Sequence, residues 1–242
     1  MTDKPILTYR REWYQFTQIT FQLRAASLVS PRTWAGGSNV YGPHAQVWMP
    51  EFTATDQEID VWPEIAAFFD ELGGQAGLLR LGDASRLQCR YNREKQRVMQ
   101  GFSDGTGFTD GTLFLDGMMP PLAHLIASAK RGDTFVKIGG LLPSTMRALS
   151  RGDMLEFRAG GIADAIPRLH SVTLQGNTNS NGECGVKIMP PLRANLAAGD
   201  QVVLDNPTTV FHLVDDTQGK MQISVPNNAS FGFSLVEAIE NI

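Results

Sequence analysis

The residues best suited to chemistry in this 242-residue chain are three aspartates that recur every six positions. Asp104, Asp110 and Asp116 stand in a repeated Phe-x-Asp-Gly motif, so that a glycine follows each of them. Carboxylate oxygens are preferred ligands of Ca²⁺, and a calcium site is therefore one interpretation. The spacing matches neither the EF-hand loop nor the glycine-rich nonapeptide repeat.

The same repeat has two interpretations that need no metal. Asp-Gly is a turn signal, so the segment can be an irregular loop of repeated turns. Its phenylalanines, Phe102, Phe108 and Phe114, point the same way if the segment is extended. An arm over residues 99–121 that lies on an adjacent subunit fits the pattern at least as well as calcium does.

The other reactive side chains form no known catalytic pattern. The histidines are scattered along the chain: His44, His124, His170 and His212. The sequence contains no H-E-x-x-H or P-loop motif, and its G-x-S-x-G stretch at residues 101–105 falls within the Phe-x-Asp-Gly repeat. Cys89 and Cys184 are too few for a metal cage and are expected to be free thiols. We therefore expect no catalytic residue, no cofactor and no enzymatic activity.

Two further acidic patterns are explained better by turns than by chemistry. Asp215 and Asp216 precede Gly219, which is typical of a solvated hairpin turn. Arg-Gly-Asp occurs twice, at 131–133 and 151–153, and both copies lead directly into predicted strands. Turn formation therefore accounts for these tripeptides better than adhesion does.

Composition excludes several classes of function. Lys+Arg is 21 and Asp+Glu is 25, a formal charge of −4, whereas surfaces that grip nucleic-acid phosphates are normally basic. The N-terminus carries no apolar signal region. The longest apolar stretch, residues 118–129, contains two prolines and a histidine and is shorter than the roughly 20 residues of a membrane span. We expect a soluble protein with no membrane partner and no sequence-specific nucleic acid.

The first part of the chain predicts strand, loop, strand, helix and strand. Residues 17–24 alternate apolar and polar, which indicates a half-buried strand. Residues 30–42 form a long loop or protruding hairpin, in which Trp34 and Tyr41 are candidates for contact with another subunit. A second strand covers 46–52, with Val47, Met49 and Phe52 as candidates for the core and Pro50 at an edge or a strand end.

One helix is predicted over about residues 61–72. Asp60 can cap it, and Pro63 lies in its first turn, where a missing N–H costs little. An apolar stripe (Ile65, Phe68, Phe69, Leu72) recurs at helical spacing. Gly73-Gly74 ends the helix, and residues 77–81 indicate a buried strand.

The second part of the chain predicts short strands separated by turns. Residues 133–138, 151–157, 168–174, 185–188 and 199–204 indicate a small β-barrel, with Phe135 on one face of the first strand and Val136 and Ile138 on the other. Residues 210–216, 221–225 and 231–239 indicate longer strands that complete the sheet begun near residue 17. We therefore predict a mainly β protein with three parts: 1–98 together with 206–242, the arm 99–121, and an inserted barrel domain 122–205.

The order of several weak motifs resembles the distal tail proteins of siphophages, which are bacteriophages with long, non-contractile tails. These motifs are Gly152-Asp153, Asn181-Gly182, residues 190–193 (Pro-Pro-Leu-Arg), 198–200 (Ala-Gly-Asp), Asn206-Pro207, 211–216 (Phe-His-Leu-Val-Asp-Asp), 231–234 (Phe-Gly-Phe-Ser) and Glu237-Ala238. The N-terminal layout of strand, Trp34 loop, strand, helix and Gly-rich step is also similar, as is the Phe-x-Asp-Gly run.

The resemblance implies a structural virion protein of the tail tip, or baseplate, made in the host cytoplasm. It implies a split β-barrel ring domain with one flanking helix, an outer domain of oligonucleotide-fold or galectin type, and a belt hairpin at residues 30–42. Copies of the chain would form a ring, usually a hexamer, that joins the tail tube protein to the tail hub and lets DNA pass. The tape-measure protein is a further partner.

Other classes of function remain open at this point. They are another tail-tip ring protein, a tail-tip carbohydrate or receptor-binding module, and a small cell-wall hydrolase. Residues 133–205 contain no Trp or Tyr, which argues against glycan stacking in the barrel domain. A hydrolase would need a pair of acidic residues facing one cleft, and the sequence contains no evident pair.

Overall fold

The computed structural model describes residues 6–13, 15–29, 40–57, 61–87, 89, 123–161, 166–219, 222–224 and 228–239. The protein is mainly β with one α-helix among these residues, as predicted. Its contacts divide the chain into two compact units. The sheet unit is Met1–Leu81 with Val210–Ile242, and the barrel unit is Gly82–Thr209. The boundaries differ from the predicted 98 and 206.

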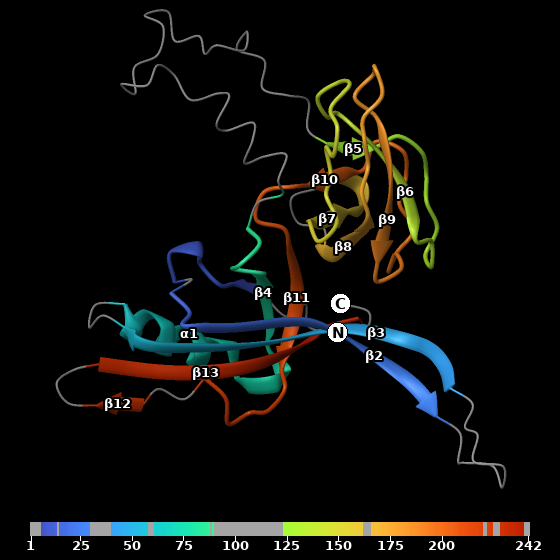
Figure 1. Ribbon diagram of the computed structural model, residues 1–242. Helices are drawn as coiled ribbons and strands as arrows, with labels where there is room; N and C mark the ends of the chain where they lie inside the picture. The colour runs from blue at the N-terminus through green and yellow to red at the C-terminus, as the bar shows by residue number, and fades with distance from the viewer. Residues whose placement is uncertain are drawn as a thin grey trace, which may run out of the picture. The chain divides into compact units, whose positions relative to one another are not determined.

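The sheet unit is built from both ends of the chain (Figure 1). Its strands are β1 (Ile6–Thr8), β2 (Gln18–Val29), β3 (Val40–Gln57), β4 (Leu78–Gly82), β11 (Thr208–Leu213), β12 (Gln222–Ser224) and β13 (Asn228–Glu237). They form one seven-stranded sheet in the order β1-β4-β11-β13-β3-β2, with β12 paired to β13. β1 and β4 are parallel, whereas β13 is antiparallel to both β11 and β3. Strands far apart in the sequence are thus neighbours in the sheet.

The alternation predicted for β2 is confirmed. On β3, Phe52 is buried as predicted, but the core positions predicted for Val47 and Met49 are wrong. Ile19, Phe21 and Leu23 are half-buried, and across the ladder Leu23 lies opposite Trp48. Opposite residues of an antiparallel pair share a face, so Trp48 is buried and Val47 and Met49 are only half-buried.

Pro50 lies at a local edge of the sheet, because it pairs with Phe21 of β2 while the pairing of β3 with β13 covers only residues 51–57. Pairing of β3 with β13 begins at Glu51, directly after this proline. Proline has no N–H to donate to a ladder, which fits a position where the second ladder ends.

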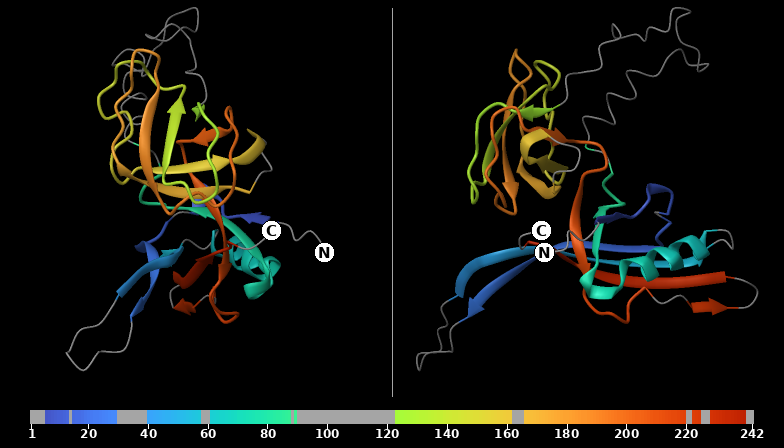
Figure 2. Two further views of the ribbon diagram at one scale, coloured as in Figure 1. Left: turned by 90° about the vertical axis from the view of Figure 1, so that its right-hand side faces the viewer. Right: turned by 180° about the vertical axis from the view of Figure 1, so that it is seen from behind.

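The helix is confirmed as α1 (Trp62–Leu72), which lies against the sheet (Figure 2). Its buried residues are the predicted stripe of Ile65, Phe68, Phe69 and Leu72. Gly73 ends it with a left-handed φ of 67°, a conformation that glycine adopts at little cost. The predicted cap is wrong: Val61 is the N-cap residue, without a side-chain cap hydrogen bond, and Asp60 lies outside the described residues.

Aromatic rings fill the space between α1 and the sheet. Phe69 meets Phe233 of β13 with ring centroids 5.1 Å apart, and Phe233 stacks on Phe52 of β3, also at 5.1 Å. The N-terminal segment closes this core, because Tyr9 contacts Phe68 at 5.6 Å and Trp13 at 5.3 Å. Trp13 belongs to a short 3₁₀ turn, η1 (Arg11–Trp13). A second 3₁₀ turn, η2 (Gly74–Ala76), follows α1.

The barrel unit contains a closed barrel, as predicted for this part of the chain. Its strands are β5 (His124–Leu125), β6 (Phe135–Gly139), β7 (Met154–Arg158), β8 (Arg168–Leu174), β9 (Cys184–Met189) and β10 (Gln201–Val203), with the 3₁₀ turn η3 (Ala159–Gly161) after β7. The order is β10-β5-β6-β9-β8-β7, and β7 pairs with β10 to close it. Every pair is antiparallel.

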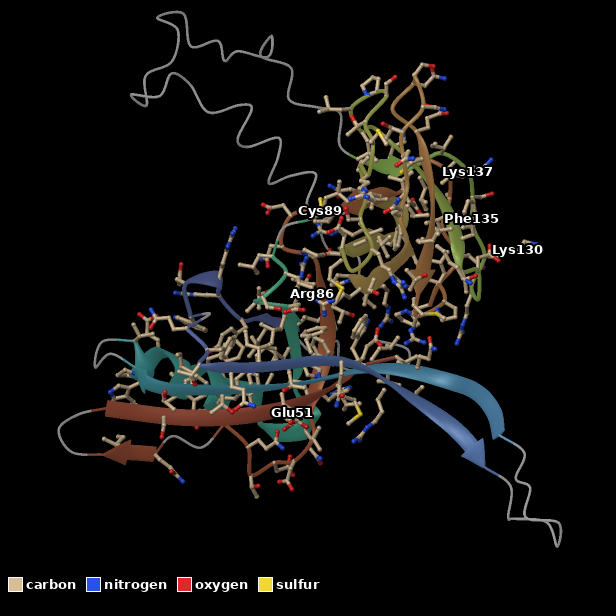
Figure 3. The ribbon with its side chains drawn as sticks, in the orientation of Figure 1. Glu51, Arg86, Cys89, Lys130, Phe135 and Lys137 are labelled. Atoms are coloured by element: carbon tan, nitrogen blue, oxygen red, sulfur yellow. The ribbon has the colours of Figure 1, made fainter. Side chains whose placement is uncertain are left out.

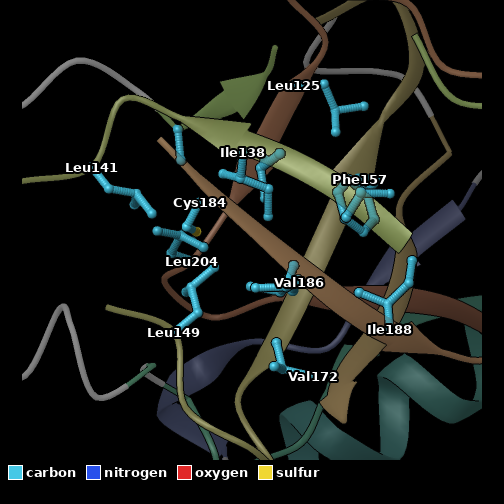
Figure 4. Close-up of a cluster of buried hydrophobic side chains, with 14 of the residues drawn as sticks. Leu125, Ile138, Leu141, Leu149, Phe157, Val172, Cys184, Val186, Ile188 and Leu204 are labelled. Carbon is cyan, nitrogen blue, oxygen red and sulfur yellow. The ribbon is translucent and has the colours of Figure 1, made fainter. Parts of the chain in front are cut away.

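The barrel interior is apolar, and its branched side chains interdigitate (Figure 4). On β6, Val136 and Ile138 are buried while Phe135 is 51% exposed, so the predicted faces of this strand are confirmed. Phe135 and Lys137 point away from the barrel (Figure 3). Cys89 and Cys184 are free thiols in the barrel core, so Cys89 belongs to the barrel unit and not to the predicted 1–98 part.

The helices in the described residues fall short of the requirements of a membrane-spanning helix. No helix there combines the length and the apolar character that crossing a bilayer requires.

Candidate functional site

The structure leaves most of the predicted site residues undescribed. Trp34 lies outside the described residues, and so does the arm with Phe102, Phe108, Phe114, Asp104, Asp110 and Asp116. Tyr41 belongs to β3 rather than to a loop, since its backbone pairs with Leu28 of β2, and its contact with another subunit stays a prediction. The hairpin ladder extends to Val29 and Val40, so the connection is shorter than the predicted loop 30–42.

The Gly-Asp sequences form one recurring turn at the entrances to barrel strands. Asp133, Asp153 and Asp200 each accept a hydrogen bond from the backbone N–H three residues earlier, at 2.7–2.8 Å. The preceding glycines, at 132, 152 and 199, have φ values of 93–96°. These turns lead into β6, β7 and β10, so both Arg-Gly-Asp tripeptides act as turns, as predicted.

Asp215 and Asp216 also have local hydrogen-bonding roles. Asp215 accepts from the N–H of Thr217 at 2.7 Å, which is the turn geometry expected from the sequence. Asp216 accepts from the N–H of Gln75 at 2.7 Å and so ties the turn to η2. The Nδ1 atom of His212 lies 3.0 Å from the carbonyl of Gln75, which makes His212 a donor to the same segment. Asp216 and His212 therefore hold η2, which follows α1, against the end of β11.

Glu156 is a fully buried carboxylate that was not singled out in the sequence. It is 0% exposed on β7. One carboxylate oxygen accepts from Nε of Arg158 at 2.5 Å, and the other accepts from the N–H and the hydroxyl of Thr208 at 2.8 and 2.9 Å. Buried charges are paired and hydrogen-bonded in this way when they stabilise a fold, and Glu156 therefore fastens Thr208, near the end of the barrel unit, to β7.

Within the described ranges, no three or more His, Cys, Asp or Glu side chains are grouped so that they could hold a metal ion. The calcium interpretation of the Phe-x-Asp-Gly repeat concerns residues outside those ranges and stays a prediction.

The candidate assembly surface is the free side of β2 together with the β2–β3 hairpin. β2 is the last strand of the sheet path and has a partner on one side only among the described strands. Only residues 51–57 of β3 pair with β13, so the rest of β3 has β2 as its single strand neighbour (Figure 1). Long edges of this kind can accept a strand from another chain.

The base of this hairpin is anchored firmly. Where pairing with β13 ends, the backbone N–H of Trp48 donates to Oε2 of Glu237 at 3.2 Å. Trp48 is 3% exposed and its ring lies 5.3 Å from that of Phe21. The hairpin therefore leaves the sheet from a fixed, buried base, which suits a strand pair that contacts a neighbour.

Comparison with known proteins gives no family. No protein-family model matches the chain, and no curated protein matches its sequence.

Proposed function

We propose that this protein is a structural component of a tail-tip ring, with the distal tail protein of a siphophage as the form that fits best. In this role the chain forms a ring, a hexamer in the expected case, that joins the tail tube to the tail hub. DNA passes through the lumen of the ring. The virion tail tip is then its place of action.

The single observation that carries the proposal is the sheet made from both chain ends with a long unshared edge. β3 pairs with β13, which comes far later in the sequence, and the residues of the barrel unit lie between these two strands in the chain. A ring needs each copy to offer one surface and accept another, and an edge strand can supply such a contact through its backbone.

Charge and sequence order support the same role. With a net charge of −4, the protein is not built to grip the phosphates of passing DNA. The motif order described above resembles distal tail proteins. The proposal includes three further points. The sheet closes as a split barrel, the barrel unit is of the oligonucleotide-fold or galectin type, and the partners are the tail tube, hub and tape-measure proteins.

Light scattering coupled to size exclusion tests the ring directly. We expect a mass near six times the 26.5 kDa of one chain, and annular particles by negative-stain electron microscopy. A monomer at every concentration that also fails to form rings on purified tail tubes contradicts the proposal.

A variant pair tests the hairpin as the contact. Trp34→Ala is expected to lower the ring fraction, because Trp34 stands in the sequence between β2 and β3 and is a predicted contact with another subunit. Met146→Ala is the control, since Met146 is 80% exposed in the barrel unit and lies outside the hairpin. Equal ring fractions for the two variants would remove Trp34 from the interface.

A further inference from the structure

A cavity opens at one end of the barrel in the barrel unit. Its volume is about 210 Å³, and its lining comes from the end of β7, the start of β8 and the segment after β9. Because neighbouring strands are antiparallel, these points lie at the same end of the barrel. Barrel mouths are common positions for ligand sites.

The lining combines an apolar surface with three nitrogen-bearing side chains. Phe157, Leu192 and Leu196 supply apolar surface, while Arg168, His170 and Arg193 supply the polar atoms. No aspartate or glutamate is among the described lining residues. The mouth therefore has a positive electrostatic character over an apolar floor.

His170 supplies a second, independent observation. It lies opposite Leu155, a core residue of the barrel, so its ring points into the barrel, and it is 0% exposed. Nδ1 is 2.7 Å from the carbonyl oxygen of Pro190. Since a carbonyl oxygen can only accept, Nδ1 carries a hydrogen. Nε2 has no hydrogen-bond partner in the described part of the chain, although it is buried.

The surroundings of His170 keep its imidazole ring uncharged. Burial, followed by the positive charges of Arg193 and Arg168, lowers the pKa of His170 to about 4, against the opposing effect of the Pro190 carbonyl. The side chains that face it from β7 are Leu155 and Phe157, which carry no charge, and the Phe157 ring lies 5.3 Å away edge-on. An anion in the mouth would offset the charge of both arginines, and Nε2 could then take up a proton and donate it to the anion.

We propose that the barrel mouth binds the carboxylate of a small apolar acid, held by Arg168 and Arg193. His170 Nε2 takes up one proton from solvent and donates it in a hydrogen bond to the same carboxylate. The guanidinium group pairs well with planar carboxylates. An apolar cavity of about 150 Å³ accepts benzene, so a cavity of this size takes an aromatic ring with a carboxylate attached. The mostly apolar floor favours such a ligand over inorganic phosphate.

Titration of the full-length protein with benzoate, benzamide and inorganic phosphate tests the site. Binding is followed by calorimetry and by the ¹⁵N signals of the His170 ring. We expect saturable benzoate binding, a shift of Nε2 toward the protonated form, and binding of benzamide and phosphate at least about tenfold weaker. Equal binding of benzamide, or tighter binding of phosphate, overturns the proposal.

Matched variants assign the effect to the mouth. Arg168→Gln and Arg193→Gln are each expected to weaken benzoate binding about tenfold, with Arg193→Lys between wild type and Arg193→Gln. Arg151→Gln, at an exposed turn of the same unit, is expected to bind as wild type does. Near-ultraviolet circular dichroism checks that each variant is folded. Identical affinities for folded Arg168→Gln, Arg193→Gln and Arg151→Gln would refute the assignment.

A peptide pair distinguishes the two sources of such a carboxylate. Ala-Ala-Phe with a free C-terminal carboxylate is compared with its C-terminal amide. Tighter binding of the free acid than of benzoate identifies a chain terminus of a partner as the ligand, whereas benzoate binding alone identifies a free small acid. Binding of neither overturns the site.

Discussion

Replacing Glu156 with Gln should destabilise the barrel unit strongly while leaving its shape unchanged. The carboxylate is fully buried and accepts three hydrogen bonds, from Arg158 and from both donors of Thr208. An amide keeps the volume but has one acceptor oxygen instead of two. The glutamine N–H group therefore faces a donor of Arg158 or Thr208, which it cannot accept from. Arg158, whose side chain is 17% exposed, also loses the charge of Glu156.

The expected cost follows from these contacts. Losing one hydrogen bond to a charged group costs about 1.5–3 kcal/mol, and breaking a buried ion pair costs about 3–5 kcal/mol. Because Arg158 keeps some contact with water, we expect about 3 kcal/mol for Glu156→Gln. Thr208→Val removes only the hydroxyl donor and should cost about 1.5 kcal/mol. The two residues touch, so the double variant should cost clearly less than the sum.

Urea unfolding followed by circular dichroism measures these differences. Glu183→Gln is the matched control, because its carboxylate accepts an exposed hydrogen bond from Asn179, and its cost should stay within about 0.5 kcal/mol. A loss below about 1 kcal/mol for Glu156→Gln would show that the buried carboxylate does not fasten Thr208 to the barrel.

Three further predictions concern the barrel unit. The pKa of His170 is lowered from 6.5 to about 4, so between these pH values the unfolded chain binds more protons than the folded chain. The free energy of unfolding should therefore fall by up to about 3 kcal/mol as the pH drops from 6.5 to 4. Urea unfolding should show this fall in the control variant His124→Gln, which keeps His170, but not in His170→Gln. Gly182→Ala should lower the melting temperature more than Gly152→Ala does. Both glycines have a positive φ, but a Cβ at 182 would also clash with the Leu141 carbonyl, whereas nothing lies within 4 Å of a Cβ at 152. Burial raises the pKa of Cys184 to about 11, so iodoacetamide should label it slowly at pH 8 until the protein unfolds, as mass spectrometry can follow.

Local pattern alone determined much of the fold. The stripe of α1, the alternation of β2 and β6, and the Gly-Asp turns all depend on residues within a few positions of one another. Backbone geometry repeats over these distances, with a period of 2 in strands and 3.6 in helices, so the sequence carries the signal directly.

Tertiary structure decided what depends on distant partners. The strands β1 and β5 were not predicted from the sequence, because three- and two-residue segments have no period of their own and exist through pairing with β4 and with β6 and β10. The buried face of β3 follows from its register with β2, which a pattern of mixed apolar residues cannot fix.

The polar groups with the clearest chemistry also became visible only in three dimensions. Glu156 and Thr208 are 52 positions apart, and His170, Arg193 and Phe157 meet only because the barrel closes. The sequence determines which side chains can carry charge or accept a proton. Barrel closure decides which of them lose water together, and loss of water gives a buried group its energetic weight.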